Sequence, residues 1–293
     1  MGNFETMKPY SYYSLHPSSL YLDGGAMFGI IPKPLWNKKI PSDELNRIPM
    51  TMRVWLIKSK DKLIVIDSGA GDYQGEKFNE RYGLLNPPKS FQSLLKESMG
   101  AEPGDVTDFV LTHLHFDHAC GALTGLDLKP SFPNATLHLH RAHYEYSLKP
   151  SLRDGGSFQQ PIIKKTLESY QNIHWLNEMD NHITESLYFQ TCHGHTPFQI
   201  LPYNKDFIFL ADVIPTHAHL SIPWVMGYDL QPSITCNEKQ LLLDWISQKN
   251  LNIIFDHDAN NIGGKVLKNQ QSSQFELVNV FKSQQTYFEE VKI

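Results

Sequence analysis

The chain has 293 residues, of which 41% are hydrophobic, and a formal net charge of −5 at pH 7. This length and composition suit one large α/β domain, so we interpret residues 1–293 as a single domain with a sizeable core. Mixed charges without a basic stripe argue against nucleic acid as a partner, and three scattered cysteines, Cys120, Cys192 and Cys236, indicate a reducing compartment rather than a disulfide framework.

The N-terminal residues 1–8 lack the charged start and the apolar run of a signal peptide. No apolar run in the sequence approaches the roughly 20 residues that cross a bilayer. We therefore expect a cytoplasmic protein without a membrane partner.

The first half of the chain begins its regular structure with two apolar strands, at residues 52–57 and 62–66, separated by a polar turn at 58–61. A helix is expected at residues 91–99, because apolar residues recur there at helical spacing and a glycine follows. A short apolar strand at residues 106–111 leads into the most informative segment of the chain.

That segment, Leu-Thr-His-Leu-His-Phe-Asp-His at residues 111–118, holds three imidazoles and a carboxylate within six consecutive positions. Imidazole and carboxylate groups are the ligands that suit zinc, and also manganese, iron or cobalt. His113 and His115 lie two residues apart, so in an extended segment their side chains point the same way and can hold one ion. Asp117 and His118 are neighbours in the following turn and can face a second ion. The segment predicts a metal site on a loop anchored by a buried strand.

The second half of the chain predicts more strands whose ends carry ligand-type residues. Strands are expected at residues 135–140, 186–191, 207–210 and 252–255, and helices at residues 160–170 and 238–247. Residues 149–156 form the only linker-like stretch. His195, Asp212 and His257 each follow a predicted strand, and Gly194 permits a sharp turn that directs His195 toward a metal. Each signal alone is weak, but their number and order point to one shared site.

Taken in order, the motifs resemble those of the metallo-β-lactamase superfamily: His-x-His-x-Asp-His, Gly-His-Thr-Pro, a strand-end Asp and a strand-end His. Residues 65–69, Val-Ile-Asp-Ser-Gly, are similar to a further element of that superfamily. The resemblance covers the chain from about Trp55 onward. It implies an α/β (α+β) fold, the αβ/βα four-layer sandwich, with two sheets face to face, helices outside and a dinuclear site at one edge. Residues 1–50 are expected to pack over that site.

The resemblance also implies a role for each ligand-type residue. A first metal ion would be held by three imidazoles: His113, His115 and His195. A second ion would be held by Asp117, His118 and His257, with Asp212 bridging the two ions. Asp67 would orient a ligand imidazole through its other nitrogen. The expected cofactors are therefore two divalent transition-metal ions, zinc first, with manganese, iron or cobalt as alternatives.

Three positions depart from the commoner pattern of the superfamily. Cys120 stands where a small residue is usual, and Phe198 replaces the usual Gly after Thr-Pro. His193 stands where Pro is common, two residues from His195, so it could compete as the ligand; the register of the Gly-His-Thr-Pro motif favours His195. The roles of two further histidines, His217 and His219, stay open.

The implied chemistry is hydrolysis. Two divalent ions that share a water lower its pKa, so that hydroxide, the nucleophile, exists near neutral pH. The expected catalytic residues are Asp117, as a proton shuttle, and Asp212. Residues 22–29, 211–219 and 222–228 resemble the branch that contains acyl-homoserine-lactone lactonases and methyl-parathion-type organophosphate hydrolases. We therefore expect a metal-dependent hydrolase that acts on the ester bond of a small lactone or ester.

An apolar wall is expected to receive the acyl or aryl group of the substrate: Met27, Phe28, Phe116, Trp224 and Met226. Some lactonases have a Tyr shortly after the bridging Asp, whereas here Val-Ile-Pro occupies residues 213–215, and Tyr228 is the candidate substitute. Organophosphate triesters and thioesters of the hydroxyacylglutathione type remain alternative substrates, although no basic cluster is evident for glutathione. The alternative from another class of enzyme is a mononuclear iron persulfide dioxygenase. A binding module without activity disagrees with the complete set of ligand-type residues. A homodimer is possible.

Overall fold

The computed structural model describes residues 10–84, 90–269, 271–272 and 274–293, so the prediction for residues 1–8 lies outside the described residues. Two seven-stranded sheets form the body of the fold. The first sheet has the spatial order β10 (Asn172–Leu176), β9 (Thr136–His140), β6 (Asp108–Val110), β5 (Leu63–Ile66), β4 (Val54–Lys58), β1 (Ser11–Leu15) and β18 (Phe288–Val291). The second has the order β11 (His182–Thr184), β12 (Leu187–Cys192), β13 (Gln199–Tyr203), β14 (Phe207–Phe209), β15 (Asn252–Ile254), β16 (Asn261–Lys268) and β17 (Phe275–Lys282).

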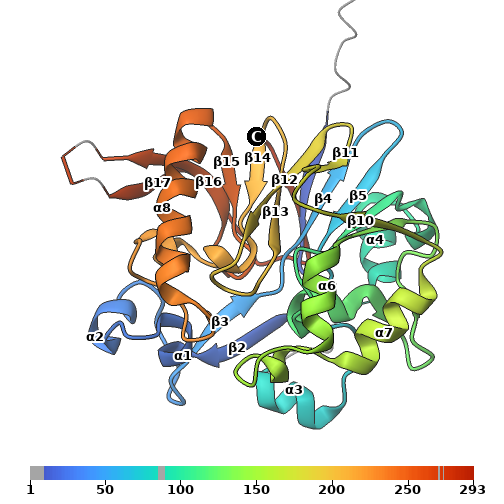
Figure 1. The fold of residues 1–293 in the computed structure, drawn as a ribbon, viewed down its shortest axis with the longest axis horizontal. Helices are drawn as coiled ribbons and strands as arrows, with labels where there is room; N and C mark the ends of the chain where they lie inside the picture. The colour runs from blue at the N-terminus through green and yellow to red at the C-terminus, as the bar shows by residue number, and fades with distance from the viewer. Residues whose placement is uncertain (1–9, 85–89, 270, 273) are drawn as a thin grey trace, which may run out of the picture.

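Helices cover the outer faces of the two sheets (Figure 1). Helix α8 (Pro232–Lys249) lies against the second sheet, while α4 (Phe91–Met99), α6 (Arg141–Leu148) and α7 (Gln160–Ser169) lie on the side of the first. The shorter helices are α1 (Gly24–Phe28), α2 (Lys33–Trp36), α3 (Glu76–Tyr82) and α5 (Phe116–Ala119). Two small sheets have two strands each: β2 (Ser19–Asp23) pairs with β3 (Arg47–Thr51), and β7 (Leu123–Thr124) pairs with β8 (Lys129–Pro130). The predicted four-layer sandwich is confirmed.

Strand β4 illustrates why the chain forms four layers. Successive side chains of a strand point to opposite faces, and Val54 to Ile57 are all buried. Trp55 packs edge-on against Phe207 of the second sheet at 5.4 Å, so its face is the one between the sheets. The alternate residues, Val54 and Leu56, join the cluster that includes the buried residues of α4. A strand buried on both faces reads as a continuous apolar run, which is why the sequence revealed it.

The N-terminal segment lies across the base of the sandwich (Figure 1). Its buried side chains belong to a third apolar cluster. Its largest members come from α1 and α2, where Phe28 and Trp36 stack at 5.2 Å. The cluster also includes Phe116 of the metal-motif segment and Met226 of a distant loop. Residues 10–50 thus pack beside the segments that carry the ligand-type residues.

Several element boundaries differ from those expected. The helix expected at 238–247 begins six residues earlier, at Pro232, because proline suits the first helical turn, and it ends where Asn250 adopts a left-handed conformation. The strand expected at 106–111 is shorter, as β6. The linker-like stretch 149–156 is no linker: it contains the short helical turn that starts at Gly155 and contributes to the wall of a cavity. None of the described helices is long and apolar enough to cross a membrane.

Candidate metal centre

The ligand-type residues meet at one edge of the sandwich because their strands end there. In the first sheet β5 and β6 run parallel, and Asp67 and the metal-motif segment follow their carboxyl ends. In the second sheet β14 and β15 run parallel, and Asp212 and His257 follow theirs. Strand β12 shares that direction, since β13 is antiparallel to both β12 and β14, and His195 follows β12. The motifs, which are far apart in the sequence, therefore form a single cluster in space.

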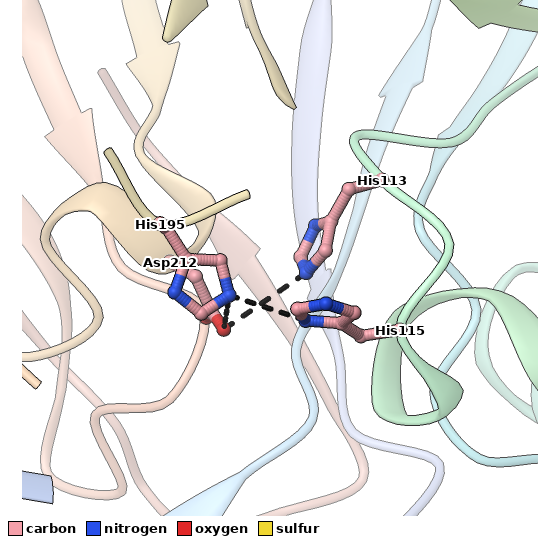
Figure 2. A group of neighbouring side chains, drawn as sticks. All are labelled: His113, His115, His195 and Asp212. Carbon is pink, nitrogen blue, oxygen red and sulfur yellow. Dashed lines mark hydrogen bonds and ion pairs between the residues drawn. The ribbon is translucent and has the colours of Figure 1, made fainter. Parts of the chain in front are cut away.

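A first group consists of His113, His115, His195 and Asp212, all buried (Figure 2). His195 Nε2 lies 3.1 Å from His115 Nδ1 and 3.1 Å from Asp212 Oδ2. His113 Nε2 lies 3.9 Å from the same carboxylate oxygen. The three imidazoles that the sequence analysis assigned to a first ion therefore converge on one oxygen of Asp212.

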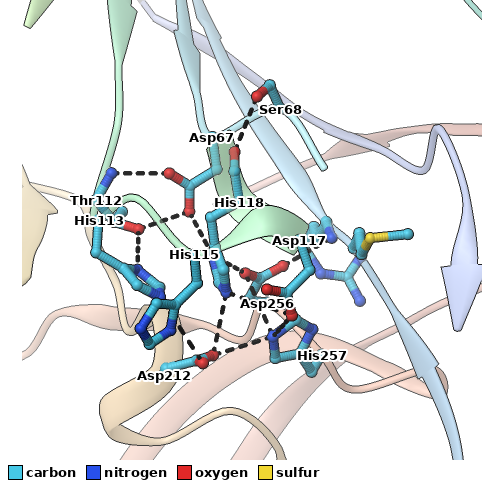
Figure 3. A network of polar contacts seen from close by, with 12 residues as sticks. Asp67, Ser68, Thr112, His113, His115, Asp117, His118, Asp212, Asp256 and His257 are labelled. Carbon is cyan, nitrogen blue, oxygen red and sulfur yellow. Dashed lines mark hydrogen bonds and ion pairs between the residues drawn. The ribbon is translucent and has the colours of Figure 1, made fainter. Parts of the chain in front are cut away.

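A second group lies on the other side of Asp212 (Figure 3). Asp212 Oδ1 is 3.4 Å from His118 Nε2 and 3.0 Å from His257 Nε2. Asp117 Oδ2 lies 3.9 Å from the first of these nitrogens and 3.7 Å from the second. Each oxygen of Asp212 thus faces a different set of imidazoles, which is the arrangement that a bridging carboxylate requires.

The outer contacts of the imidazoles fix which nitrogen carries the proton. His195 Nδ1 donates to Asp229 at 2.9 Å, and His257 Nδ1 donates to the carbonyl of Thr51 at 2.6 Å. The same nitrogen of two further rings is also engaged: His113 with Thr112 Oγ1 at 3.0 Å, and His118 with Asp67 at 3.0 Å. Because Nδ1 is engaged on the outer side of each of these four rings, Nε2 is the nitrogen that points into the centre, whereas His115 presents Nδ1 there.

This donor set fits a pair of divalent transition-metal ions. The Nε2 atoms of His113 and His118 and Oδ1 of Asp212 are buried without a hydrogen-bond partner among the described residues. Two ligand atoms about 2.1 Å from a tetrahedral zinc ion lie about 3.4 Å apart. The distances within the two groups run from 3.0 to 3.9 Å. Buried polar atoms that lack partners and converge at this spacing are the signature of a metal site.

Asp256 is a carboxylate at the second group that sequence analysis missed. It groups tightly with His118, Asp212 and His257. Its Oδ2 lies 2.9 Å from His118 Nδ1, on the side of the ring turned away from Asp212, and its Oδ1 accepts from the backbone N–H of Arg53. Asp117 lines the cavity over the centre, whereas Asp256 does not. Asp256 therefore lies behind the His118 ring without a hydrogen bond to it, and Asp117 is the carboxylate on the substrate side.

The centre attracts cations. Burial opposes protonation of His195, but Asp212 and Asp229 outweigh it and raise the pKa of His195 to about 9. Burial opposes protonation of His257 as well, yet Asp256 and Asp212 raise its pKa to about 10. Burial also opposes ionisation of Asp212, but the nearby imidazoles hold its pKa well below the usual range. Bound metal ions would replace these protons, because ligands must be deprotonated to bind them.

His195, rather than His193, points into the centre. His193 Nδ1 accepts from the backbone N–H of Phe198 at 3.2 Å, and its Nε2 lies 3.5 Å from Glu178 at the half-exposed surface. Gly194 is needed for close approach, because a Cβ there would lie 2.3 Å from Thr235 Oγ1 in α8. Phe198 has a φ of 62°, a left-handed conformation that explains why Gly is common at this position.

The two histidines of open role lie outside both groups. His219 is buried, stacks on Phe28 at 4.7 Å and donates from Nε2 to the carbonyl of Met27. Burial lowers the pKa of His219 to about 3, so this ring is neutral. His217 Nδ1 pairs with Asp258 at 2.5 Å. Both rings stabilise the loops around the centre.

A cavity of about 400 Å³ opens above the centre, and His115, Asp117, His195, Asp212 and His257 form its floor. Four of the six residues expected to bind substrate line it: Met27, Phe116, Met226 and Tyr228. Phe28 and Trp224 do not line it; they pack edge-on against each other behind Met27. Leu22, Met50, Tyr82 and part of the stretch 149–156 complete the wall, which no local sequence pattern indicated.

Comparisons with known proteins show what the chain is similar to. Residues 53–257 match the family model described as the metallo-beta-lactamase superfamily. Over 169 residues the chain is 27% identical to the N-acyl homoserine lactonase AttM of Agrobacterium fabrum. That match covers 55% of this chain and 62% of the relative, so the chain spans less than two thirds of the relative's length.

Two solved structures have a similar fold. A probable metal-dependent hydrolase from Staphylococcus aureus matches with a TM-score of 0.84 and 24% identity, over 94% of this chain and 97% of that one. AidC, a dizinc quorum-quenching lactonase, matches with a TM-score of 0.73 and 20% identity, over 92% of this chain and 94% of that one. At these identities, the matches establish the fold.

Proposed function

Because the chain belongs to the metallo-beta-lactamase superfamily, we propose that it is a dinuclear metal-dependent hydrolase that opens lactones or cleaves related small esters. The observation that carries this proposal is the position of Asp212 at the floor of the cavity. One of its oxygens faces His113 and His195, and the other faces His118 and His257. A catalytic centre needs such an open side, whereas a purely structural metal site is closed on all sides.

Metal ions held by these residues would lower the pKa of a bound water to near neutrality and polarise the carbonyl oxygen of the substrate. The residues of the chain supply the rest. Asp117 lies at the floor of the cavity, beside both imidazoles of the second group, and can accept the proton of the attacking water. As the oxygen of that water bonds to the carbonyl carbon and its proton passes to Asp117, the ring C–O bond breaks. Asp117 then returns the proton to the departing oxygen, which gives a hydroxy acid.

The walls of the cavity favour a substrate with an apolar group attached to the reacting ester. Met27, Met50, Phe116 and Met226 line it from three parts of the chain. Methionine side chains adapt to apolar groups of different shape. The curated relative named above is an N-acyl homoserine lactonase, a lactone-opening enzyme, and this supports the lactone as the first substrate class to test.

Thioesters of glutathione fit this cavity less well. Glutathione carries two carboxylates, but Arg153 is the one Lys or Arg side chain among the residues that line the cavity in the described part of the chain. The full set of imidazoles and carboxylates on both sides of Asp212 also favours two ions over the single iron of a persulfide dioxygenase.

The substrate class is tested by a panel of an acyl lactone, an aryl phosphotriester and a glutathione thioester, assayed with zinc-loaded protein. We expect kcat/KM for the lactone to exceed the other two by at least about tenfold, because the cavity offers an apolar wall and few cations. Asp212→Ala protein purified in parallel controls for a contaminating hydrolase. A thioester cleaved fastest, or oxygen consumption with a persulfide and iron but no hydrolysis, would contradict the proposal.

A further inference from the structure

His143 occupies a position between the two loops that carry the first group of imidazoles. It lies in the first turn of α6, which follows β9, and β9 is parallel to β6, so α6 begins at the same edge as the centre. Its side chain is fully buried. Its Nε2 accepts from the backbone N–H of Leu114 at 2.8 Å, and its Nδ1 donates to the carbonyl of Pro197 at 2.7 Å. Neither nitrogen of His143 is left to bind a metal.

The two backbone partners flank the proposed ligands. Leu114 lies between His113 and His115, and Pro197 follows His195 by two residues. The loops also share a backbone hydrogen bond from Ile200 N to the carbonyl of Thr112, 3.0 Å long, but it lies on the side of β13. Without His143, the loops would stay joined at Thr112 while the segments that carry the imidazoles lost their common partner.

The ring of His143 must be neutral to bond to both loops in this way. One nitrogen accepts from an N–H while the other donates to a carbonyl; a charged ring has two donors and no acceptor, so it cannot make both bonds. The ring of His143 packs against Phe158, with 5.9 Å between the ring centroids. The same Phe158 packs edge-on against His115, with 4.7 Å between the centroids. The hydrogen bonds and the packing therefore restrain the same loop segment.

We propose that His143 is a positioning residue that ties the loop of His113 and His115 to the loop of His195. It thereby keeps their three imidazoles at ligand spacing before an ion binds. The inference rests on the proposed function only for what the imidazoles bind; the tie itself is a property of the chain. Residues that orient ligands in this way change metal affinity by about 10- to 100-fold.

His143→Ala and His143→Gln separate the tie from simple packing. Glutamine offers one acceptor and one donor on the same planar group, so it can restore part of the tie, whereas alanine restores none. His138→Ala is the matched control. His138 is also a buried histidine, and it lies in β9 of the first sheet. Its ring nitrogens bond to Asp108 and His174, away from the centre.

The first measurement is amide hydrogen exchange of Leu114 in each protein as purified. We expect this amide to exchange at least about tenfold faster in His143→Ala than in wild type or His138→Ala, because it loses its acceptor. This result needs no knowledge of the ion or the substrate. Unchanged protection of Leu114 in His143→Ala would overturn the tie, even if lactone hydrolysis is confirmed.

The second measurement is competition with a chromophoric chelator, which gives the affinity of each protein for zinc. We expect His143→Ala to weaken one of two bound ions by about 10- to 100-fold, His143→Gln to recover part of that loss, and His138→Ala to keep both affinities. Equal weakening in His138→Ala would assign the effect to general loss of packing and contradict the inference. A wild-type protein that binds no ion would overturn the proposed function, and with it the metal-affinity part of this inference, while the exchange result still decides the tie.

Discussion

Asp212→Ala is expected to lose metal from both groups and to lower lactone hydrolysis by several orders of magnitude. Each oxygen of this carboxylate lies within 3.9 Å of a different pair of imidazole nitrogens. Removing it takes away a ligand from both ions and leaves two cations close together without the anion they share. Elemental analysis of the purified variant, together with its turnover of an acyl lactone, measures both effects.

Asp206→Asn is the matched control for this prediction. Asp206 precedes the same strand, β14, at its opposite end, where its carboxylate accepts from the Tyr12 hydroxyl at 2.6 Å. The Asp206→Asn protein should therefore retain both ions and near-normal turnover. An Asp212→Ala protein that kept both ions and turned over normally would mean that another carboxylate bridges them.

His195→Ala is expected to abolish hydrolysis and remove one ion, whereas His193→Ala should change turnover only a few-fold. His195 Nε2 lies 3.1 Å from His115 Nδ1, and its own Nδ1 is held by Asp229. Water in the vacated position would be a weaker ligand that no residue of the chain holds in place, so the ion would be lost. His193 contacts Glu178 at the half-exposed surface instead.

The paired variants should be compared by ion content and by lactone hydrolysis. Retention of about one ion per chain in His195→Ala would agree with an intact second group around His118 and His257. The opposite pattern, an inactive His193→Ala beside an active His195→Ala, would move the ligand by two residues and break the assignment of the first group.

The proposed ligands were accessible to sequence analysis because their chemistry is local to each strand end. His113 and His115 are two residues apart in one extended segment, and the side chain of Asp212 follows a strand of three buried apolar residues. Residue type, spacing and the preceding strand were enough to group them. The distances between the ligand atoms could be known only from the folded structure.

Apart from Asp67, which the resemblance indicated and which contacts His118 Nδ1, the residues that orient the ligands could not be found in the same way. Asp229 contacts His195 across 34 residues, and His143 contacts Pro197 across 54. An Asp or His in a loop or at a helix start is common, and no local pattern marks its partner. For Asp256 a weak signal existed: it directly precedes His257 after a buried strand.

Strands at or next to the edges of the sheets were also hidden from sequence analysis. Strands β1 and β17 are only partly buried, so their residues do not form the apolar runs that identified β4 and β5. The stretch 149–156 was interpreted as a linker because it is polar and contains glycines. Its role depends on tertiary contacts: Arg153 reaches the carbonyl of Gly227 and both line the cavity.

The most direct test of the dinuclear centre is a zinc titration of metal-free protein, with lactone hydrolysis measured at each addition. We expect activity to rise until about two ions per chain are bound and elemental analysis then to find about two, since the ligand set on both sides of Asp212 is too large for one ion. Full activity at about one ion per chain, with no further gain from a second, would contradict it.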